Sequence, residues 1–303
     1  MKIAIGVPTY NGAARANELF QSILLRTSLA KVEVVLVDDG SPRVEETRAL
    51  ARAWESRLPL KYVEHGVNRG ISAAWNTATR NSEADIVVLA NDDVIVPSGD
   101  WLSAIAHPLK HSPQVGGVGV NWHAFLSSDV SRLLIDDREV TPRDPVSKAL
   151  APERRNYEQG PPGRVMCPTG QLFAFRRADY DSIGGFDDGY VSFFEESDFF
   201  TSMAAAGKIS IQLNYPMCWH RWSATFGSNP ELNASARMDA SRRRYIEKWK
   251  VPPEFQGNPP YCPFDYTNPK YLGAIGDVEV EYLKRDRSVG RGILHRSGAW
   301  SDR

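Results

Sequence analysis

Residues 85–97 read DIVVLANDDVIVP, an apolar run that is interrupted by Asn91, Asp92 and Asp93 and closed by Pro97. Ionised carboxylates are costly to bury unless they are paired, hydrogen-bonded or bound to a cation. Asp and Asn are also ordinary turn residues, so a strand that ends in a polar turn accounts for this stretch as well. The segments around it must decide between a turn and a site.

Strand and helix patterns alternate through residues 1–100. Runs of β-branched and other apolar residues predict strands, and apolar residues at helical spacing predict helices between them. This alternation indicates an α/β fold, with a mostly parallel central sheet flanked by helices and built from right-handed crossovers. The expected strands are 2–7, 32–37, 60–65 and 85–90, and the expected helices are 14–26, 44–56 and 71–81.

Polar side chains follow three of these expected strands. In parallel sheets, ligands bind beyond the carboxyl ends of the strands, so the three groups are expected to share one binding site. The groups are Thr9, Tyr10 and Asn11 after the first strand, Asp38 and Asp39 after the second, and Asn91, Asp92 and Asp93 after the fourth.

The second half of the chain is less regular. We expect a helix at 101–111, kinked or split by Pro108, and a strand at 115–120. Residues 121–165 are polar with weak periodicity, which indicates a mobile loop or a small insertion over the site. Further elements are expected as a strand within 165–177, a helix start that carries Glu195, Glu196 and Asp198, a strand at 209–222 that delivers His220, and a basic helix at 234–249.

The composition narrows the class of protein. The chain has 303 residues, 42% of them hydrophobic and 24% charged, as in soluble globular proteins. A formal net charge of -1 gives no overall field that would attract nucleic acid or an acidic membrane. The start, MKIAIGVPTYNG, lacks a signal-peptide pattern, and no apolar run reaches the length of a membrane span, so we expect a cytoplasmic protein.

Seven short motifs, taken in order, resemble the family 2 glycosyltransferases over roughly residues 1–227. The motifs are VPTYNG, VDDGSP, NRGISAAWN, LANDDV, GGFDD, FFEESD and WHRWSAT. The resemblance implies a GT-A (Rossmann-like) fold with a nucleotide-binding half, 1–97, and an acceptor-binding catalytic half, 98–227. Residues 228–303 would then form a C-terminal helix and an irregular extension.

The resemblance implies that Asp38 or Asp39 binds the base of a nucleotide, usually uracil, through its N3–H. A carboxylate suits this role because it only accepts hydrogen bonds. Asp39 could equally cap a helix or turn, and we prefer Asp38 for the base. Other residues that match nucleotide-sugar positions are Pro8, Thr9, Tyr10, Asn11, Asn68, Gly70, Asn76, Asn91, Asp92 and Gly170.

LANDDV stands where the family carries its DxD motif, whose carboxylate binds a divalent cation, Mn²⁺ or Mg²⁺. The match makes Asp93 the metal-binding acid, and His220 matches a histidine that many members place near the same cation. Asn91 departs from the pattern because it replaces the first Asp of the motif and carries no charge.

FFEESD corresponds to the family's ED motif, whose carboxylate takes the proton from the acceptor hydroxyl. The match places Glu196 at the base position, where the family usually has Asp, with Glu195 and Asp198 as rivals. Acidic residues also favour helix starts for electrostatic reasons alone.

The resemblance implies a hexosyltransferase-like activity: the inverting, metal-assisted transfer of a sugar from a nucleoside diphosphate sugar to an acceptor hydroxyl. UDP is the expected nucleotide. A sugar nucleotidyltransferase is a rival, although it should carry a Gly-rich phosphate loop where this chain has a single Gly12. A non-catalytic sugar- or nucleotide-binding module is the second rival. A glycan is the expected acceptor; the basic run Arg242, Arg243 and Arg244 keeps a modified nucleic acid base or contact with a membrane surface open.

Overall fold

The computed structural model describes residues 1–97, 99–136, 163–165, 167–221, 224–251 and 253. The strands are β1 (Ile3–Thr9), β2 (Val32–Asp38), β3 (Leu60–Glu64), β4 (Ile86–Ala90), β5 (Val94–Ile95), β6 (Val115–Ala124), β7 (Gly163–Val165), β8 (Leu172–Arg176) and β9 (Ile209–His220). The helices are α1 (Ala13–Arg26), α2 (Val44–Trp54), α3 (Ile71–Arg80), α4 (Trp101–His111), α5 (Val130–Ile135), α6 (Arg177–Ile183), α7 (Glu195–Ala205), α8 (Ala224–Ser228) and α9 (Ala234–Trp249). Two short 3₁₀ turns, η1 (Ser127–Asp129) and η4 (Pro230–Leu232), join them.

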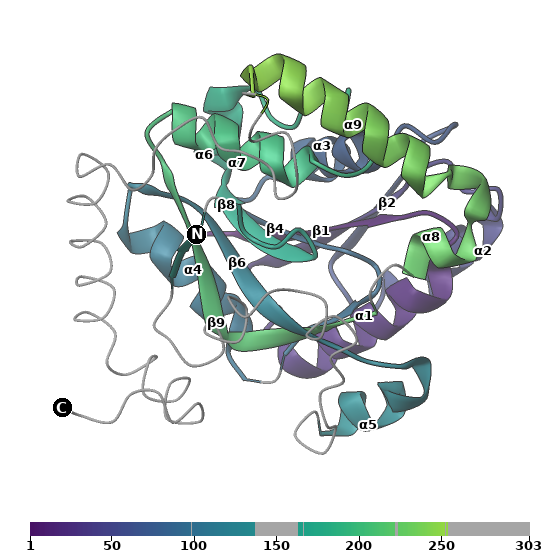
Figure 1. Cartoon of the computed structure of the whole chain (residues 1–303). Coiled ribbons are helices and arrows are strands. Elements are labelled where there is room, and N and C mark those ends of the chain that lie inside the picture. Colours follow the sequence, from purple (N-terminus) through teal and green to yellow (C-terminus); the bar gives the residue numbers. More distant parts are fainter. Residues whose placement is uncertain (98, 137–162, 166, 222–223, 252, 254–303) are drawn as a thin grey trace.

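One sheet organises the described residues. Its nine strands run in the order β3-β2-β1-β4-β8-β6-β9-β5, with β7 paired to β9 (Figure 1). Strands β3, β2, β1 and β4 are parallel, as their sequence predicts. Beyond β4 the sheet is mixed, because β8 runs antiparallel to both of its neighbours while β6 and β9 are parallel. The α/β fold is confirmed, with its fully parallel part confined to the first half.

Helices cover both faces of this sheet. On one face, α1, α2 and α4 bury apolar side chains such as Leu19, Trp54 and Ile105. On the other, α3, α6 and α7 bury Trp75, Tyr180, Phe199 and others in an aromatic-rich cluster. Each fully buried side chain of this size stabilises the fold by roughly 1.5–3 kcal/mol. The strand ends that carry the polar groups are therefore held by a packed core on both sides.

The expected loop at 121–165 is wrong over its first part. Strand β6 continues to Ala124, because Trp122 and Ala124 pair with Cys218 and His220 of β9. The turn η1 and helix α5 follow, and β7 occupies 163–165. At this half-exposed end of β6 polar residues alternate with apolar ones, so the sequence analysis did not recognise residues 121–124 as part of the strand. The rest of the expected loop, residues 137–162, lies outside the described residues.

Pro108 does not split α4, which is continuous from Trp101 to His111. Asp100 caps its start by accepting a hydrogen bond from the N–H of Ser103, and the N–H of Ser112 closes its end on the carbonyl of Pro108. The proline lies in the last turns, so few backbone hydrogen bonds remain to be disrupted.

Candidate active site

The structure brings the three predicted polar groups together at one edge of the sheet. Thr9 and Asp38 are direct neighbours in the parallel pairing of β1 and β2. The hydroxyl of Thr9 donates to Asp92 Oδ2 over 2.6 Å, which joins the end of β1 to the turn after β4. These groups therefore form one acidic region rather than three separate turns.

Asp38 and Asp39 differ sharply in their partners. Asp39 accepts hydrogen bonds from the backbone N–H groups of Arg69 (3.0 Å) and Gly70 (2.8 Å) and from Asn68 Nδ2 (2.8 Å), and it contacts His65 Nδ1 at 2.8 Å. Burial raises its pKa, and these hydrogen bonds oppose that effect. Asp39 therefore holds the segment that leads into α3, whose N-cap is Gly70.

Asp38 keeps an oxygen without a partner. Its Oδ1 accepts from the N–H of Ser41 at 2.7 Å, and within the described residues its fully buried Oδ2 accepts no hydrogen bond. An unpaired buried carboxylate oxygen costs free energy, which a ligand with an N–H donor would recover.

Asn76 is placed inside the fold rather than at the open edge. Its Nδ2 donates to the carbonyl of Phe186, and its Oδ1 accepts from Tyr180 Oη and from the N–H of Phe186. The side chain is 1% exposed. It ties α3 to the turn that precedes α7.

The two acids of the LANDDV turn also differ in their hydrogen bonds: Asp92 accepts several, whereas Asp93 Oδ1 accepts none from the described residues. Asp92 is buried against Arg15, whose Nε and Nη2 lie 3.1 and 3.2 Å from its carboxylate oxygens. Burial raises the pKa of Asp92 and the Arg15 charge opposes the rise. Arg15 lies on the buried face of α1, where an arginine needs an acid partner. Its position on the apolar side of the predicted helix could have indicated such an ion pair, but the sequence analysis did not consider it.

Asp93 lies beside His220. The pairing of β5 with β9 aligns Val94 with His220, which puts His220 Nε2 3.2 Å from Asp93 Oδ1. The two atoms are close but not aligned as a hydrogen bond, since Asp93 Oδ1 accepts none from the described residues. Both side chains are nearly buried, at 7% and 9% exposure.

This pair suits a shared divalent cation. Two neighbouring ligands on an octahedral ion, each about 2.1 Å from it, lie about 3 Å apart, close to the observed separation. Mg²⁺ is typically held by one or two protein carboxylates and completed by substrate phosphates. No group of three or more His, Cys, Asp or Glu side chains that could hold a metal ion occurs in the described part of the chain.

A third acidic group starts α7. Phe193 and Phe194 lie at φ 68° and 64°, a left-handed conformation that is rare for bulky residues, and they turn the chain into the helix. Glu195 and Glu196 follow at once, and an oxygen of each is buried without a partner among the described residues. Burial and the charge of Glu196 raise the pKa of Glu195 well above its usual value.

Glu196 differs from Glu195 in its surroundings. Burial raises its pKa too, but the backbone N–H groups of Glu196 and Ser197 oppose the rise. A Cβ on Gly170 would lie 3.1 Å from Glu196 Oε1, so the carboxylate sits against that glycine. Gln171 follows Gly170, and its backbone carbonyl accepts a hydrogen bond from the N–H of Asn91 at 3.0 Å. This bond links the segment beside Glu196 to the LANDDV turn.

Asp198 is fully engaged. Lys248 Nζ lies 2.8 Å from its Oδ2, and its Oδ1 accepts from Trp249 Nε1 at 2.8 Å and from Tyr190 Oη at 3.3 Å. Only 2% of the residue is exposed. Of the three acids named from the sequence, Glu195 and Glu196 have open oxygens and Asp198 does not.

Residues near the C-terminal end of the described chain contact the segment 1–97, and the sequence analysis did not predict these contacts. Asn11 Nδ2 donates to Asn229 Oδ1 at 2.9 Å, and Tyr10 Oη lies 3.5 Å from Glu231. Arg237 of α9 donates to Asn68 Oδ1 at 3.0 Å. The only indication of these contacts in the sequence was the basic composition of α9.

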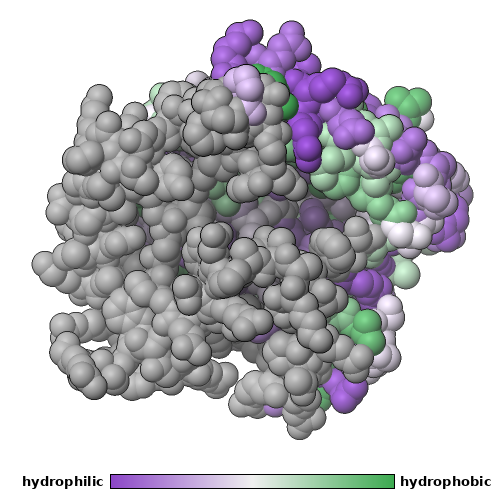
Figure 2. All heavy atoms as spheres, in the orientation of Figure 1, coloured by the Kyte–Doolittle hydropathy of each residue, from purple (hydrophilic) through white to green (hydrophobic). Residues whose placement is uncertain are grey.

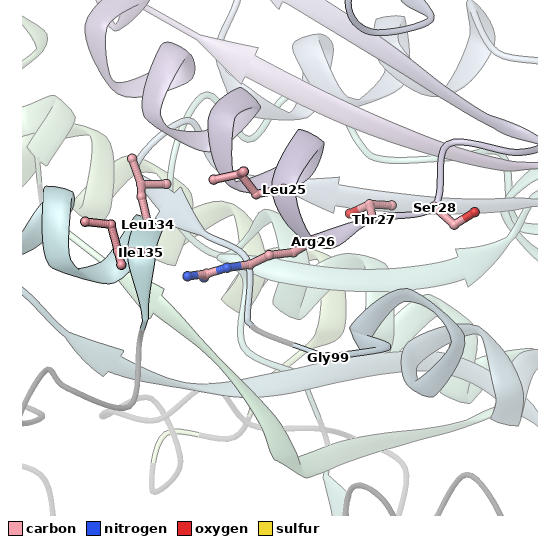
Figure 3. Close-up of a pocket in the computed structure, with 7 residues that line it drawn as sticks. All are labelled: Leu25, Arg26, Thr27, Ser28, Gly99, Leu134 and Ile135. Atoms are coloured by element: carbon pink, nitrogen blue, oxygen red, sulfur yellow. The ribbon is translucent and has the colours of Figure 1, made fainter.

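A separate hollow lies away from these acids. It is lined by Leu25, Arg26, Thr27, Ser28, Gly99, Leu134 and Ile135, at the C-terminal end of α1 and against α5 (Figure 3). Arg15 lies in the first turn of the same helix, eleven positions before Arg26, which is about 16 Å at the helical rise. None of the described residues that line the hollow is acidic, and we do not count it as part of the site.

Comparison with known proteins agrees with the fold. The model of "Glycosyl transferase family 2" matches residues 4–184. The chain is 26% identical over 249 residues to the "Uncharacterized glycosyltransferase YwdF" of Bacillus subtilis, covering 82% of each protein. It is 25% identical over 261 residues to "Uncharacterized protein y4gI" of Sinorhizobium fredii. This match includes 82% of the present chain but only 28% of the relative's length.

Solved structures share the architecture. The mannosyltransferase PcManGT of Pyrobaculum calidifontis, in complex with GDP-Man and Mn²⁺, superposes with a TM-score of 0.56 at 21% identity, over 99% of this chain and 76% of that one. S. aureus TarS 1-349 in complex with UDP-GlcNAc gives 0.55 at 18% identity, over 92% and 80%. At these identities the likeness shows the fold.

The fold is that of the GT-A α/β proteins. The match of the family model over more than half of the chain shows that the chain belongs to glycosyl transferase family 2. As for membranes, the helices in the described residues are all too short or too polar to cross a bilayer.

Proposed function

We propose that this glycosyltransferase moves a sugar from a UDP-sugar to an acceptor hydroxyl with inversion, using Glu196 as general base and a divalent cation held by Asp93 and His220. The observation that carries the proposal is a set of buried acid oxygens, at the strand ends and at the start of α7, that accept no hydrogen bond from the described residues. Asp38, Asp93 and Glu196 each present one. The neighbouring Asp39 and Asp92 have their oxygens hydrogen-bonded, and Glu195 has an open oxygen of its own.

The base assignment rests on the two glutamates. Two buried carboxylates in contact ionise in sequence, because the charge of the first opposes ionisation of the second. Burial raises the pKa of both glutamates, and the charge of Glu196 adds to the rise at Glu195. The backbone N–H groups of Glu196 and Ser197 favour the charged form of Glu196, so we assign the charge of the pair, and with it the role of base, to Glu196. Glu196 then accepts the proton of the acceptor hydroxyl as that oxygen bonds to the anomeric carbon.

The rest of the reaction follows from charge. The bond between the anomeric carbon and the diphosphate oxygen breaks, and its electron pair leaves with the nucleoside diphosphate. A Mn²⁺ or Mg²⁺ ion, when bound, neutralises charge on this leaving group. Asp93 and His220 hold the ion in our proposal, while the open Oδ2 of Asp38 accepts the N3–H of uracil and Asn91 contributes an uncharged amide beside the phosphates.

UDP is proposed because a carboxylate acceptor suits an imide N3–H, and because TarS, of the same fold, is described in complex with UDP-GlcNAc. The GDP-Man complex of PcManGT supports a test of other nucleotides. Phe226 is proposed to border the acceptor or sugar: it is half-buried and stacks on Phe193 with ring centroids 5.0 Å apart, two residues before Glu195.

The test is a thermal-shift panel of UDP-glucose, UDP-N-acetylglucosamine, GDP-mannose and dTDP-glucose, each with and without MnCl₂. A ligand at 100 times its Kd stabilises the folded state by about 2.7 kcal/mol, which raises the melting temperature by several degrees. We expect a UDP-sugar to do so only with metal present, and to release UDP on prolonged incubation. Stabilisation without release would indicate a binding module, and pyrophosphate release would indicate a nucleotidyltransferase.

A further inference from the structure

We propose that helix α9 is part of the catalytic apparatus: Lys248 and Trp249 hold Asp198 and thereby position Glu196 for proton transfer. This inference rests on the proposed function, since it presumes that Glu196 is the base. Both α7 and α9 lie beyond the residues matched by the family model, so the family match does not assign this role.

The first support is the way Asp198 is held. Lys248 and Trp249 come from the last turn of α9, and each contacts one oxygen of the Asp198 carboxylate at 2.8 Å. Asp198 lies two residues after Glu196 in the first turn of α7. Its position sets the rotation of that turn about the helix axis, and this rotation decides where the Glu196 carboxylate points.

The second support is that α9 forms hydrogen bonds with the chain both before and after the Phe193–Phe194 turn. After the turn, Tyr245 Oη and Thr201 Oγ1 are hydrogen-bonded at 2.8 Å, in addition to the Asp198 contacts. Before the turn, Ser241 Oγ donates to the carbonyl of Ser192 at 2.7 Å. Figure 1 shows α9 crossing beside α7, as this pair of attachments requires.

A further ion-pair group strengthens the attachment before the turn. Arg244 Nη2 and Lys248 Nζ lie 2.7 and 3.1 Å from the carboxylate of Asp187. Gly189 leaves room for this arrangement, because a side chain there would clash with the guanidinium of Arg244. Lys248 thus bridges Asp187 and Asp198, one on each side of the turn.

The turn between these attachments needs such a frame. Two consecutive bulky residues at positive φ are strained, and strained backbone persists where surrounding contacts hold it. The Phe194 ring packs 5.4 Å from that of Tyr245, in an apolar cluster that also contains Tyr190 and Val251. The turn therefore has its geometry fixed by α9, and Glu195 and Glu196 are the first residues that follow it.

Small displacements matter at this place. Glu196 Oε1 is close enough to Gly170 that a single added carbon there would be crowded, so the carboxylate has little freedom in that direction. Misplacing a reacting group by about 1 Å can cost about 10²-fold in rate. A loosened α7 start should therefore lower kcat while the nucleotide contacts at Asp38 and Asp93 stay in place.

The outer face of α9 supplies the control. Hydrophilic side chains line the upper edge of the molecule, where Figure 1 places this helix (Figure 2). Arg243 and Lys248 are both exposed on this helix, but Lys248 contacts Asp187 and Asp198. Replacing Arg243 removes the same charge from the same helix without touching Asp187 or Asp198.

The experiment compares K248M, W249F, K248R and R243M with E196Q in the full chain. The probes are the four nucleotide sugars of the panel with MnCl₂, and the readouts are nucleoside diphosphate release (kcat and KM) and donor Kd. We expect K248M and W249F to lower kcat 10- to 100-fold, with the donor Kd changed less than about 3-fold. K248R should recover part of the loss and R243M should match the parent.

W249F is less prone to misfolding than K248M, because it keeps an aromatic ring against the apolar cluster while it removes the indole N–H donor together with the five-membered ring that carries it. If K248M fails to fold, W249F decides, with its melting temperature measured beside its kcat. Unchanged kcat in folded W249F overturns the inference, as does a loss that appears in donor Kd instead of kcat. Parent-like kcat in E196Q would instead refute the proposed base, so the two failures are distinguishable.

Discussion

The turn after β4 and the first turn of α7 both bury acids close together, and the charge of one acid is compensated by a different part of the chain in each case. Each contains a buried acid paired with a cation, Asp92 with Arg15 and Asp198 with Lys248. Each also contains an acid with an unpaired oxygen, Asp93 and Glu196. The cation comes from α1 within the family match in one case and from α9 outside it in the other.

The difference teaches how to separate anchoring from chemistry in an acidic cluster. A buried carboxylate with a cation and hydrogen bonds has its charge compensated within the fold and no oxygen left for a ligand. A buried carboxylate with an open oxygen is costly, and a bound cation, donor or proton would relieve that cost. We therefore expect substitutions at the paired acids to lower stability. Substitutions at the open acids should leave stability unchanged or raise it, and they should change binding or catalysis where the acid contacts a ligand.

Glu196→Gln should give the largest effect. General-base catalysis typically contributes about 10²–10⁴-fold, so kcat should fall by that factor, measured as nucleoside diphosphate release. The donor Kd should be unchanged, because the amide keeps the size of the side chain. The fold should be no less stable, since the substitution removes a carboxylate whose pKa burial raises. A fall below tenfold would move the base to Glu195.

Asp92→Asn should be next, and it should act on stability. Removing one partner of a buried ion pair costs about 3–5 kcal/mol, because Arg15 is left with its charge uncompensated. Urea unfolding measures the loss as a lower midpoint at constant slope. The control is Arg15→Met combined with Asp92→Leu, which removes both charges and should recover most of the loss. Full stability of Asp92→Asn alone would contradict the anchoring role.

How far the sequence alone could lead differs between these two turns. The alternation of strands and helices located Asp38, Asp39 and the Asn91–Asp93 group at strand ends, and the parallel sheet confirmed that they meet. The sequence could not say which of two adjacent acids is paired, because neighbours on an extended chain face opposite sides and the partner decides.

The turn before α7 shows the harder limit. Lys248 and Trp249 reach Asp198 from about 50 residues along the chain, and no local pattern encodes such a contact. The left-handed turn at Phe193 and Phe194 contradicts their local preference, since tertiary packing imposes it. Asp198 was therefore a rival base in sequence terms, while the structure gives it three hydrogen-bonding partners.

Asp93→Asn should have a smaller effect than Asp92→Asn on folding and a clear effect on metal binding. Loss of a partner in the second shell of a metal costs about 10–100-fold in affinity, and loss of a ligand should cost at least that. The measurement is the rise in melting temperature with MnCl₂ in the presence of a bound nucleotide sugar. His220→Gln should weaken the same response. Equal Mn²⁺ stabilisation in the parent and both variants would remove these residues from the proposed metal site.

Glu195→Gln should give the smallest effect, a gain in stability that depends on pH. Burial and the charge of Glu196 raise the pKa of Glu195, so the folded state holds the proton more tightly than the unfolded state does. This stabilising contribution is complete at pH values below the unfolded pKa and is lost as pH rises through the folded pKa. The variant should therefore equal the parent near pH 4 in urea unfolding and exceed it near pH 8 by on the order of 1 kcal/mol, the cost of an unsatisfied buried acceptor. A gain of the same size at both pH values would mean that packing, not ionisation, separates the two side chains, and Glu195 would then no longer count among the open acids.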